Sequence, residues 1–386
     1  MKVAIFADSY LPTINGVVTQ IRNISKELIR RGDEVVIVAP AQDSKFSEEK
    51  IEGAQVLYLP SIALPTYSEY RVMPPHSSRI ISKIKNFKPD IVHVHTPFSA
   101  GWLGLQIGKK LKVPIVGTYH TLLPEFLMYL PIPFVKNSQW AKSVTWHYTN
   151  FFYNQCDVIT TPTKTMKEEL EKNGAKKNVV VLPNAIDFEM FNSAKKSKKS
   201  SKSTKMIYFG RISYEKNIEV LLLALRHILW KGKNVSLTIT GSGPALEYLK
   251  NIARENKISK HVDFHPTLLQ NELADHVASH DIFMTASTIE TQGLTILEAM
   301  AAGVCCIGAN HLAIPDSIKD GKNGLLFKPY DFLELAKKCE KLISEPKLRK
   351  KLAENAVQTA RNYSSAIIAT QTQDLYKSAV ANFKSK

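Results

Sequence analysis

The sequence predicts an α/β protein built from two doubly wound domains. The chain has 386 residues, too many for one ordinary hydrophobic core and suited to two domains of somewhat under about 200 residues each. Short apolar segments with the length of buried strands alternate with amphipathic helical segments, as in parallel sheets covered by helices. A lysine- and serine-rich segment at 193–204 separates two such alternations. We therefore expect domains at 1–192 and 205–362, a linker between them, and a final helix within 363–386 long enough to return to the first domain.

The first domain opens with a strand, a loop and a helix. Val3–Ala7 is a short buried-strand pattern, and an amphipathic helix from about Val17 to Arg31 follows a loop that ends at Gly16. Ligands of doubly wound sheets bind beyond the carboxyl ends of the strands. Gly16 therefore lies at a binding edge, where a glycine lets a ligand approach the backbone; a simple turn glycine is the alternative. The pattern continues with elements at Glu34–Ala39, Val56–Leu59, Pro75–Phe87, Asp90–His95, Ala100–Leu111, Pro114–Thr118, Asp157–Thr160, Lys164–Asn173 and Val179–Leu182.

Histidines also occur near the ends of these strands. His120 follows the strand Pro114–Thr118 and so lies at the expected ligand edge; either a structural role or a site role fits this position. His93 and His95 alternate along one strand, and we interpret them as structural. A metal site is not indicated, because a third ligand at a suitable spacing is missing.

The segment Leu122–Tyr153 is rich in aromatic residues and poor in acids. Packing against the sheet accounts for part of this composition. The remaining aromatic residues suit an apolar acceptor cleft or a membrane-facing surface, where Trp and Tyr lie at the interface and lysines meet lipid headgroups.

The second domain restarts the pattern at the strand Met206–Phe209, and Arg211 and Lys216 lie in the loop that follows it. Both cations suit phosphate at this edge, since Arg can hold two oxygens in a fork and Lys supplies a point charge. The strand Val235–Thr240 is followed by Gly-Ser-Gly-Pro. This sequence lacks the third glycine of a dinucleotide-binding fingerprint, which argues against a nicotinamide-dependent dehydrogenase. Leu268, in the loop after a further strand, offers an apolar contact to a nucleotide base.

The stretch Phe283–Gly303 carries the most informative pattern. A strand ending near Ala286 leads through a loop to Gly293 and a helix. A helix that starts at a glycine presents unpaired N–H groups and the positive end of its dipole, which suits phosphate. Glu290 lies in the loop and Glu298 in the helix, and these carboxylates suit hydroxyl groups instead. Two glutamates at this spacing also occur by chance, but together with the glycine they favour a nucleotide sugar as the ligand.

Composition and charge narrow the class of protein. The formal net charge of +16 and the pI near 9.4 indicate an acidic partner: phosphorylated substrates, an anionic membrane surface or nucleic acid. The segment Lys195–Lys205 contributes to this charge, but it lacks the interleaved aromatic residues of a single-strand binder. The four cysteines have no metal-binding spacing and indicate a reducing compartment. Since no apolar run approaches the roughly 20 residues of a membrane span, we expect a cytoplasmic protein with at most peripheral membrane contact.

These motifs together resemble the retaining glycosyltransferases of family 4, which have the GT-B architecture of two facing Rossmann-like domains with an interdomain cleft. The resemblance covers both domains in order, and one motif, ETQGLT, is similar to the branch that glycosylates membrane lipids such as diacylglycerol. The matching segments are PTINGV (12–17), VHTPFS (94–99), YHT (119–121), LPNAID (182–187), FGRISYEKN (209–217), GSGP (241–244) and ETQGLTILEAMAAG (290–303).

The resemblance implies a role for each matched position. Glu290 would hold the donor sugar and Glu298 the ribose, while N–H groups around Gly293, Leu294 and Thr295 would bind the phosphates. The cations Arg211 and Lys216 would neutralise the departing diphosphate, as family members do without a metal; the chain has no Asp-x-Asp motif. In the other domain, Gly16 would admit the diphosphate and His120 would contact the sugar.

The sequence therefore predicts a metal-independent, cofactor-free retaining hexosyltransferase. It would move glucose or galactose from a UDP-sugar to a membrane lipid, such as diacylglycerol or a sterol, at the inner face of the cell membrane. One alternative is the same chemistry on a soluble sugar or a polysaccharide or cell-wall precursor. An alternative of a different class is a non-enzymatic basic protein that binds nucleic acid.

Overall fold

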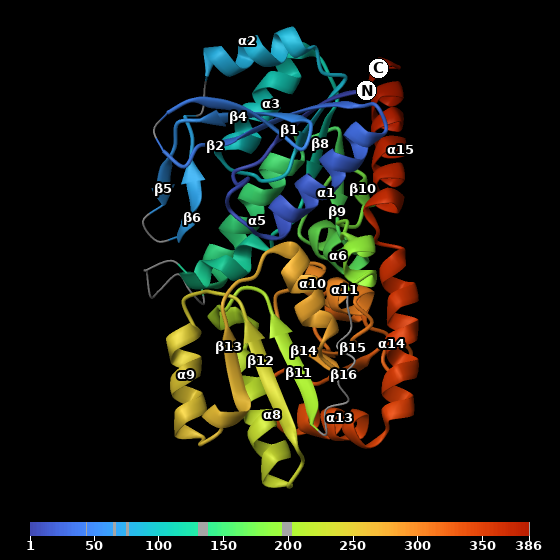
Figure 1. The fold of residues 1–386 in the computed structure, drawn as a ribbon. Coiled ribbons are helices and arrows are strands. Elements are labelled where there is room, and N and C mark those ends of the chain that lie inside the picture. Colours follow the sequence, from blue (N-terminus) through green and yellow to red (C-terminus); the bar gives the residue numbers. More distant parts are fainter. Residues whose placement is uncertain (44, 65–66, 75–76, 130–137, 195–202, 386) are drawn as a thin grey trace. The chain divides into compact units, whose positions relative to one another are not determined.

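The computed structural model describes residues 1–386 except 44, 65–66, 75–76, 130–137, 195–202 and 386 (Figure 1). The chain divides into two compact units, one formed by Met1–Ala185 with Ser365–Lys386 and the other by Ile186–Ser364. The first unit ends before the expected 192, because Phe188 and Phe191 are buried in the core of the second unit. Most of the expected linker at 193–204 lies outside the described residues.

The first unit is built on a sheet with the strand order β10-β9-β8-β7-β1-β2-β4-β3. β3 pairs antiparallel with β4, and the other described pairs of this sheet are parallel. A separate hairpin joins β5 to β6. The strands are β1 (Lys2–Phe6), β2 (Glu34–Pro40), β3 (Ser47–Ile51), β4 (Ala54–Leu59), β5 (Ile62–Leu64), β6 (Tyr67–Val72), β7 (Ile91–Val94), β8 (Ile115–Thr118), β9 (Val158–Thr161) and β10 (Val179–Val181).

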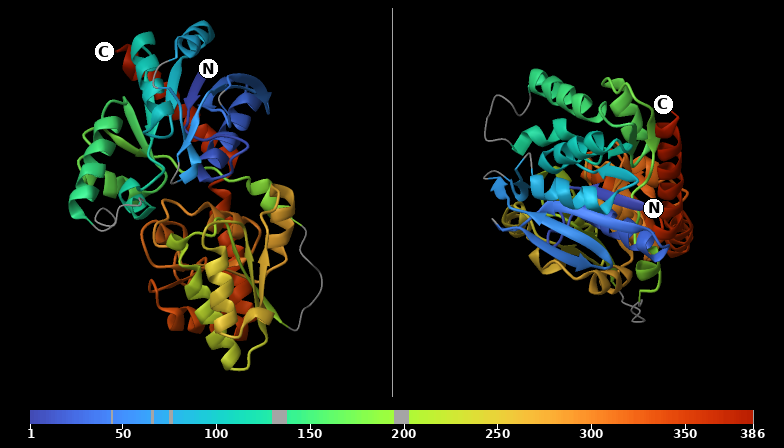
Figure 2. Two further views of the ribbon diagram at one scale, coloured as in Figure 1. Left: turned by 90° about the vertical axis from the view of Figure 1, so that its left-hand side faces the viewer. Right: turned by 90° about the horizontal axis from the view of Figure 1, so that it is seen from above.

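Helices pack along the strands of this sheet (Figures 1 and 2). Several begin at a side chain that accepts an N–H of the first turn, as helix starts require; Asn15, Ser77, Ser138 and Thr163 have this role. The helices are α1 (Gly16–Arg30), α2 (Ser78–Phe87), α3 (Ser99–Leu111), the short η1 (Leu123–Tyr129), α5 (Gln139–Tyr153), α6 (Lys164–Lys172) and α15 (Ser365–Lys384).

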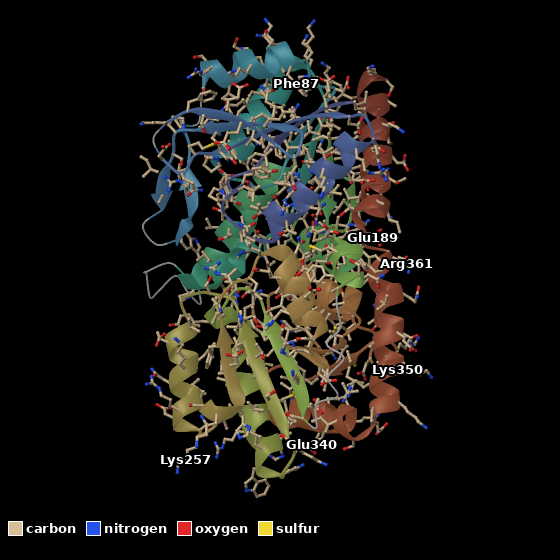
Figure 3. All side chains as sticks on the ribbon, in the orientation of Figure 1. Phe87, Glu189, Lys257, Glu340, Lys350 and Arg361 are labelled. Carbon is tan, nitrogen blue, oxygen red and sulfur yellow. The ribbon has the colours of Figure 1, made fainter. Side chains whose placement is uncertain are left out.

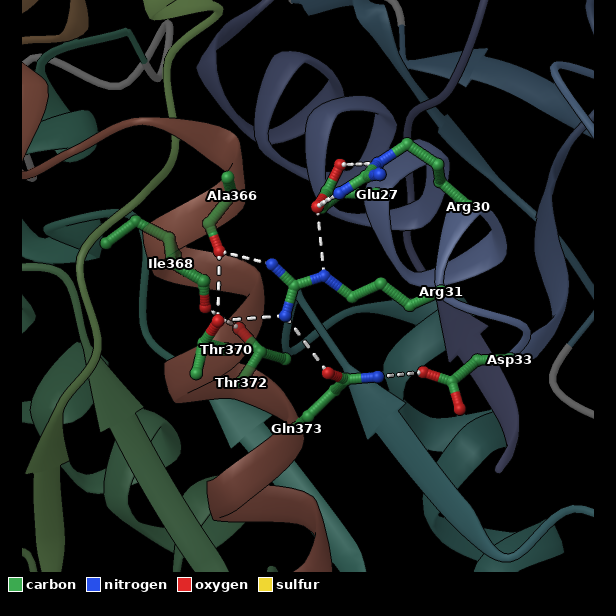
Figure 4. Close-up of polar contacts among 9 residues, drawn as sticks. All are labelled: Glu27, Arg30, Arg31, Asp33, Ala366, Ile368, Thr370, Thr372 and Gln373. Atoms are coloured by element: carbon green, nitrogen blue, oxygen red, sulfur yellow. Dashed lines mark hydrogen bonds and ion pairs between the residues drawn. The ribbon is translucent and has the colours of Figure 1, made fainter.

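The C-terminal helix α15 is fastened to α1 within the first unit. The guanidinium of Arg31 donates to the carbonyl of Ala366 at 2.6 Å, to Oγ1 of Thr370 at 2.8 Å and to Oε1 of Gln373 at 3.1 Å (Figure 4). Gln373 in turn donates to Oδ2 of Asp33 at 2.6 Å. This network fixes the helix at its first turns, and Ile368 and Ala369 complete the attachment by packing into the core of the unit.

The second unit has a parallel sheet with the order β13-β12-β11-β14-β15-β16. From β11 the chain adds β12 and β13 on one side of the sheet, and it then returns to add β14, β15 and β16 on the other side. In such a sheet the loops at the carboxyl ends of the two central strands diverge and leave room for a ligand. The strands are β11 (Thr204–Phe209), β12 (Val235–Thr240), β13 (Val262–His265), β14 (Ile282–Thr285), β15 (Cys305–Ala309) and β16 (Leu325–Phe327).

The helices of the second unit bury apolar side chains on a single hydrophobic core, except for the short η2 and η3. They are α7 (Phe188–Asn192), η2 (Tyr214–Lys216), α8 (Ile218–Trp230), α9 (Leu246–Glu255), η3 (Ser259–His261), α10 (Gln270–Ala278), α11 (Leu294–Ala301), α12 (Ile314–Ser317), α13 (Phe332–Ser344) and α14 (Pro346–Arg361). In the part of the chain that the structure describes, none of the helices has both the length and the apolar character to span a membrane.

Candidate active site

Helix α11 begins without a side-chain cap. Its N-cap Gly293 has φ 78°, in the left-handed region, and a Cβ added there would lie 2.7 Å from Cδ1 of Ile296. The carbonyl of Gly293 accepts the N–H of Ile296 at 3.0 Å. For the N–H groups of Leu294 and Thr295 the structure records no acceptor among the described residues. The helix start therefore offers free donors and the positive end of its dipole, an arrangement that binds phosphate.

The loop after β11 runs beside this helix start. A Cβ added to Gly210 would lie 3.4 Å from Cγ2 of Thr295. The next residue, Arg211, is half-buried, and burial lowers the pKa of its guanidinium below its usual value. The hydroxyl of Tyr208 donates to the carbonyl of Arg211 at 2.8 Å and holds the backbone there. Since the guanidinium remains charged at neutral pH, the residue after the point where this loop meets α11 carries a partly desolvated cation.

The glycines of the Gly-Ser-Gly-Pro motif allow two loops to meet backbone to backbone. A Cβ at Gly241 would lie 2.0 Å from the carbonyl oxygen of Gly210, and one at Gly243 would lie 2.2 Å from that of Ile212. The carbonyl of Ser242 accepts the N–H of Ile212 at 2.8 Å. These glycines therefore support the shape of the loop that carries Arg211.

Lys216 and Glu290 form an ion pair. Nζ of Lys216 lies 2.6 Å from Oε1 of Glu290, and the exposed fractions of the two side chains are only 20% and 17%. Burial raises the pKa of Glu290, but the charge and hydrogen bond of Lys216 and the hydroxyl of Ser287 lower it by more, so that it lies below its usual value of 4.5. Glu290 is therefore ionised at neutral pH, and the pair joins the loop after β11 to the loop after β14.

Asn217 strengthens the same junction. Its Nδ2 donates to the carbonyl of Ala286 at 3.2 Å and to Oγ1 of Thr288 at 3.2 Å. Its backbone is left-handed, with φ 50°, a conformation that Asn tolerates better than most residues. Because Asn217 follows Lys216 directly, this bridge holds the ammonium beside the loop that carries Glu290.

Glu298, in the second turn of α11, has a different environment. Burial and the charge of Asp187 raise its pKa to about 7. Asp187 caps α7 by accepting the N–H of Met190 at 3.1 Å, and Arg361 (labelled in Figure 3) lies over the ring of Phe188, 5.4 Å from its centroid. Among the described residues, the structure records no hydrogen bond to the carboxyl of Glu298. Such a carboxyl is suited to a ligand that brings hydroxyl donors.

Leu268 lies further along the carboxyl edge of the same sheet. It is half-buried in the loop after β13, and its neighbour Leu269 is 72% exposed. Oγ1 of Thr267 donates to Oγ of Ser242 at 3.1 Å, which links this loop to the Gly-Ser-Gly-Pro loop. The loop thus places an apolar side chain at this edge, and its contact with a nucleotide base stays a prediction.

Gly16 and His120 belong to the first unit. Gly16 is the first residue of α1, one position earlier than predicted, because Oδ1 of Asn15 accepts the N–H of Val18 at 3.0 Å and caps the helix. His120 is buried just past β8, and burial lowers its pKa to about 3. Its Nε2 lies 2.8 Å from Nδ1 of His95. The second unit thus brings its own candidate residues together. Gly16 and His120 lie in the first unit, and their contacts are those within that unit.

The sequence reasoning missed two residues that organise the ligand edges. One is Asn217. The other is Asp8, which follows β1 and is buried; it accepts Oγ of Ser99 at 2.6 Å and the N–H of Ala100 at 2.7 Å. Asp8 thereby supplies the cap of α3 that its own N-cap residue, Phe98, lacks. An acid directly after the first strand was the available signal.

Across the described ranges, no three His, Cys, Asp or Glu side chains gather as a metal site would require. The candidates instead provide main-chain donors, two cations and two carboxylates along the loops after β11 and β14 and on α11. This combination can bind a diphosphate and several hydroxyl groups at the same time.

Two family models match the chain. The model described as "Glycosyltransferase Family 4" matches residues 14–190, and the one described as "Glycosyl transferases group 1" matches residues 189–359. The two matches cover nearly the whole chain in the order of its two units.

Proteins similar to this chain along most of its length support the match to these glycosyltransferase families. The chain is 29% identical to an alpha-monoglucosyldiacylglycerol synthase of Streptococcus pneumoniae over 338 residues, 85% of this chain and 75% of the relative. It is 28% identical to the protein of that name from Acholeplasma laidlawii over 393 residues, 97% of this chain and 96% of the relative. A GDP-mannose-dependent alpha-mannosyltransferase of Corynebacterium glutamicum is 27% identical over 99% of this chain and 90% of the relative.

Solved structures with the same fold extend over the full chain. Sucrose-phosphate synthase from Thermosynechococcus elongatus superimposes with a TM-score of 0.80 at 16% identity, covering 99% of each chain. The Anabaena protein HepE, solved in complex with UDP, gives a TM-score of 0.75 at 17% identity, covering 98% of this chain and all of that one. Together with the motifs and the two Rossmann-like units, these matches show that the chain is a hexosyltransferase of glycosyltransferase family 4 with the GT-B fold.

Proposed function

We propose that this glycosyltransferase moves glucose or galactose from a UDP-sugar to a membrane lipid, such as diacylglycerol or a sterol, with retention of configuration. The observation that carries the donor half of the proposal is the uncapped start of α11 with Arg211 and the Lys216–Glu290 pair on the neighbouring loops. The UDP complex of HepE supports UDP as the nucleotide. GDP-mannose is the main competing donor, because one relative is a GDP-mannose-dependent mannosyltransferase.

The proposed diphosphate site uses the N–H groups of Gly293, Leu294 and Thr295. Arg211 and Lys216 add positive charge beside them, and hydrogen bonds to charged groups contribute about 1.5–3 kcal/mol each. Charge builds on the diphosphate as the bond to the sugar breaks, so donors already in place stabilise the transition state more than the ground state. Gly16 is proposed to admit the diphosphate from the first unit.

The two carboxylates are proposed to hold the sugars of the donor. Glu290 is ionised and already paired with Lys216, so it can accept hydroxyls of the hexose while its partner stays near the phosphates. Glu298 would accept hydroxyls of the ribose, and Leu268 would contact the base. His120 is proposed to contact the hexose.

The proposed reaction needs neither a metal nor a cofactor. The glycosidic carbon becomes cation-like as the diphosphate leaves, and the acceptor hydroxyl attacks from the same face. A phosphate oxygen of the donor takes the acceptor's proton, which balances the reaction as a lipid glycoside and a protonated nucleoside diphosphate. Transfer is therefore expected to continue in excess EDTA, and complete dependence on added Mg²⁺ would contradict this part of the proposal.

The proposed acceptor is supported by the names of the two diacylglycerol glucosyltransferases and by an exposed apolar stripe on α5. Trp140, Val144, Tyr148 and Phe151 follow helical spacing on this helix, with exposed fractions of 74%, 46%, 36% and 64%. Aromatic side chains of this kind insert into the interface of a bilayer, and a basic protein is drawn to anionic lipid. We propose peripheral binding to the inner face of the cell membrane through this stripe.

One transfer assay tests the proposal. Purified protein is incubated with radiolabelled UDP-glucose, UDP-galactose or GDP-mannose and with vesicles that contain diacylglycerol, and lipid products are separated by chromatography. We expect label from a UDP-hexose in the lipid fraction, and none with Glu290→Ala. Label that stays in a water-soluble glycoside would favour a soluble acceptor, and transfer from GDP-mannose alone would replace the proposed donor.

Vesicle flotation tests the membrane surface separately. Trp140→Ser with Phe151→Ser is expected to lower the bound fraction on anionic vesicles. Trp230→Ser is a matched control, because Trp230 is 81% exposed on a helix of the second unit. An equal effect of both variants, or no binding of the wild type to any vesicle, would contradict a role for the stripe.

A further inference from the structure

Three buried histidines lie together where β7 and β8 end in the first unit. The rings of His93 and His95 have centroids 4.0 Å apart, and those of His95 and His120 are stacked, 5.1 Å apart with an angle of 10° between their planes. The exposed fractions are 3% for His93, 4% for His95 and 7% for His120. From the sequence alone, both His93 and His95 are expected to be structural.

The hydrogen bonds separate the two. Both ring nitrogens of His93 are engaged within the fold, Nδ1 at 2.6 Å from the hydroxyl of Tyr376 on α15 and Nε2 at 2.6 Å from Oγ1 of Thr118. His95 has its hydrogen bond through Nδ1, at 2.8 Å from Nε2 of His120. Nε2 of His95 is buried and makes no hydrogen bond with a described residue. His93 therefore ties elements of the unit together, whereas the polar contact of His95 is to the candidate site residue.

We propose that His95 is a positioning residue, whose Nδ1 forms a hydrogen bond with Nε2 of His120 and thereby fixes the orientation and the tautomer of the His120 ring. The inference rests on the proposed function, in which His120 contacts the hexose. It gives His95 a role that its place in the sequence does not indicate.

One proton lies between the two rings. Burial lowers the pKa of His120 to about 3 and that of His95 well below its usual value, so both rings are neutral. A neutral imidazole carries one N–H, so the ring that donates leaves its outer nitrogen unprotonated and the ring that accepts carries its proton on the outer nitrogen. In either direction, the hydrogen bond holds each ring in a single tautomer.

The consequence for His120 is a single tautomer. With Nε2 engaged by His95, Nδ1 is fixed either as a donor or as an acceptor and does not exchange between the two roles. A ring held by one hydrogen bond and a stacked neighbour also loses the freedom to flip. Removal of His95 is expected to release both constraints without touching the phosphate-binding residues of the second unit.

Nitrogen NMR on protein with ¹⁵N-labelled histidine rings tests the arrangement directly. We expect one tautomer of His120, and a coupling across the hydrogen bond between its Nε2 and Nδ1 of His95. His95→Leu should give mixed tautomers of His120 and lower kcat by about 10- to 100-fold, with the affinity for UDP little changed. His95→Asn, whose side-chain amide can donate or accept in place of Nδ1, should restore most of kcat and one tautomer.

His93→Asn is the matched control from the same strand region. It is expected to lower the thermal stability, since it disturbs two hydrogen bonds, while the His120 tautomer stays as in the wild type. The proposal is overturned if His120 of the wild type shows a mixture of tautomers, or if His95→Leu leaves both kcat and the His120 signals unchanged. Wild-type turnover of His120→Leu would instead refute the role of His120 in the proposed function. The NMR coupling between the two rings of the wild type would still be observed in that case.

Discussion

The raised pKa of Glu298 predicts that donor binding depends on pH. With a pKa of about 7, the carboxyl is about one-tenth ionised at pH 6, half ionised at pH 7 and nine-tenths ionised at pH 8. Hydroxyl groups of a ribose would donate to the ionised form and stabilise it. The donor therefore binds the ionised protein better, and binding releases a proton.

The size of the effect follows from these fractions. If only the ionised form of Glu298 accepts the ribose, the Kd for the donor falls about tenfold between pH 6 and pH 8, or about 1.4 kcal/mol in binding free energy. UDP-glucose is the appropriate ligand, because both of its phosphates are esterified and keep their charge over this range. Isothermal titration calorimetry without acceptor gives the Kd, and buffers of different ionisation enthalpy give the released proton, about one half at pH 7.

Glu298→Gln is the control, since its amide keeps the shape of the side chain and does not titrate. Its Kd should be flat between pH 6 and pH 8 and no lower than the wild-type value at pH 6. A wild-type Kd that is the same at pH 6 and pH 8 would refute the role of Glu298. So would a Glu298→Gln variant with the full slope, because another group would then titrate.

Three further predictions concern the same helix and its neighbours. The folded-state pKa of Glu298 exceeds its usual value of 4.5. The stability that this carboxyl contributes is therefore fully present below pH 4.5 and is lost as the pH rises through about 7. In urea titrations, Glu298→Gln should raise the free energy of unfolding by up to about 3 kcal/mol at pH 8 and leave it unchanged at pH 4. Lys216→Ala and Glu290→Ala should each lower kcat/KM by about 100-fold or more, and the double variant should lose little beyond the worse single one, since the pair acts as a unit; additive losses in the steady-state rates would argue against that unit. Gly293→Ala should destabilise the protein by about 1–3 kcal/mol, because this position has a positive φ and an added Cβ would contact Ile296. It should also weaken UDP binding at least tenfold. A wild-type affinity for UDP in calorimetry would show that the start of α11 does not bind the phosphates.

The elements around the site were predictable where a strand is buried on both faces. Val235–Thr240 has the predicted bounds, because an interior parallel strand is a short apolar run between turn residues. The edge strand Val262–His265 also has the predicted bounds. The same reasoning found the helix start at Gly293, since a glycine before an apolar helical run is a local signal. By contrast, β3 (Ser47–Ile51) was missed: it is an antiparallel edge strand with the sequence SEEKI, which has no apolar alternation.

The contacts that give the site its electrostatics were not predictable from local pattern. Lys216 and Glu290 are 74 positions apart, and they meet because β11 and β14 are neighbours in the sheet. The raised pKa of Glu298 depends on Asp187 at the start of α7, an element that the pattern did not reveal because it has only five residues. His93 and His95 look alike in the sequence, and their hydrogen bonds alone distinguish them. Sequence motifs therefore predicted which residues belong to the candidate site, and tertiary contacts set the charge states of these residues.

A crystal structure of the protein with UDP-glucose tests the central claim most directly. We predict diphosphate oxygens within about 3 Å of the main-chain nitrogens of Leu294 and Thr295, with the carboxyls of Glu290 and Glu298 against the hexose and the ribose. A diphosphate bound away from the start of α11, or both carboxyls turned from the ligand, would contradict it.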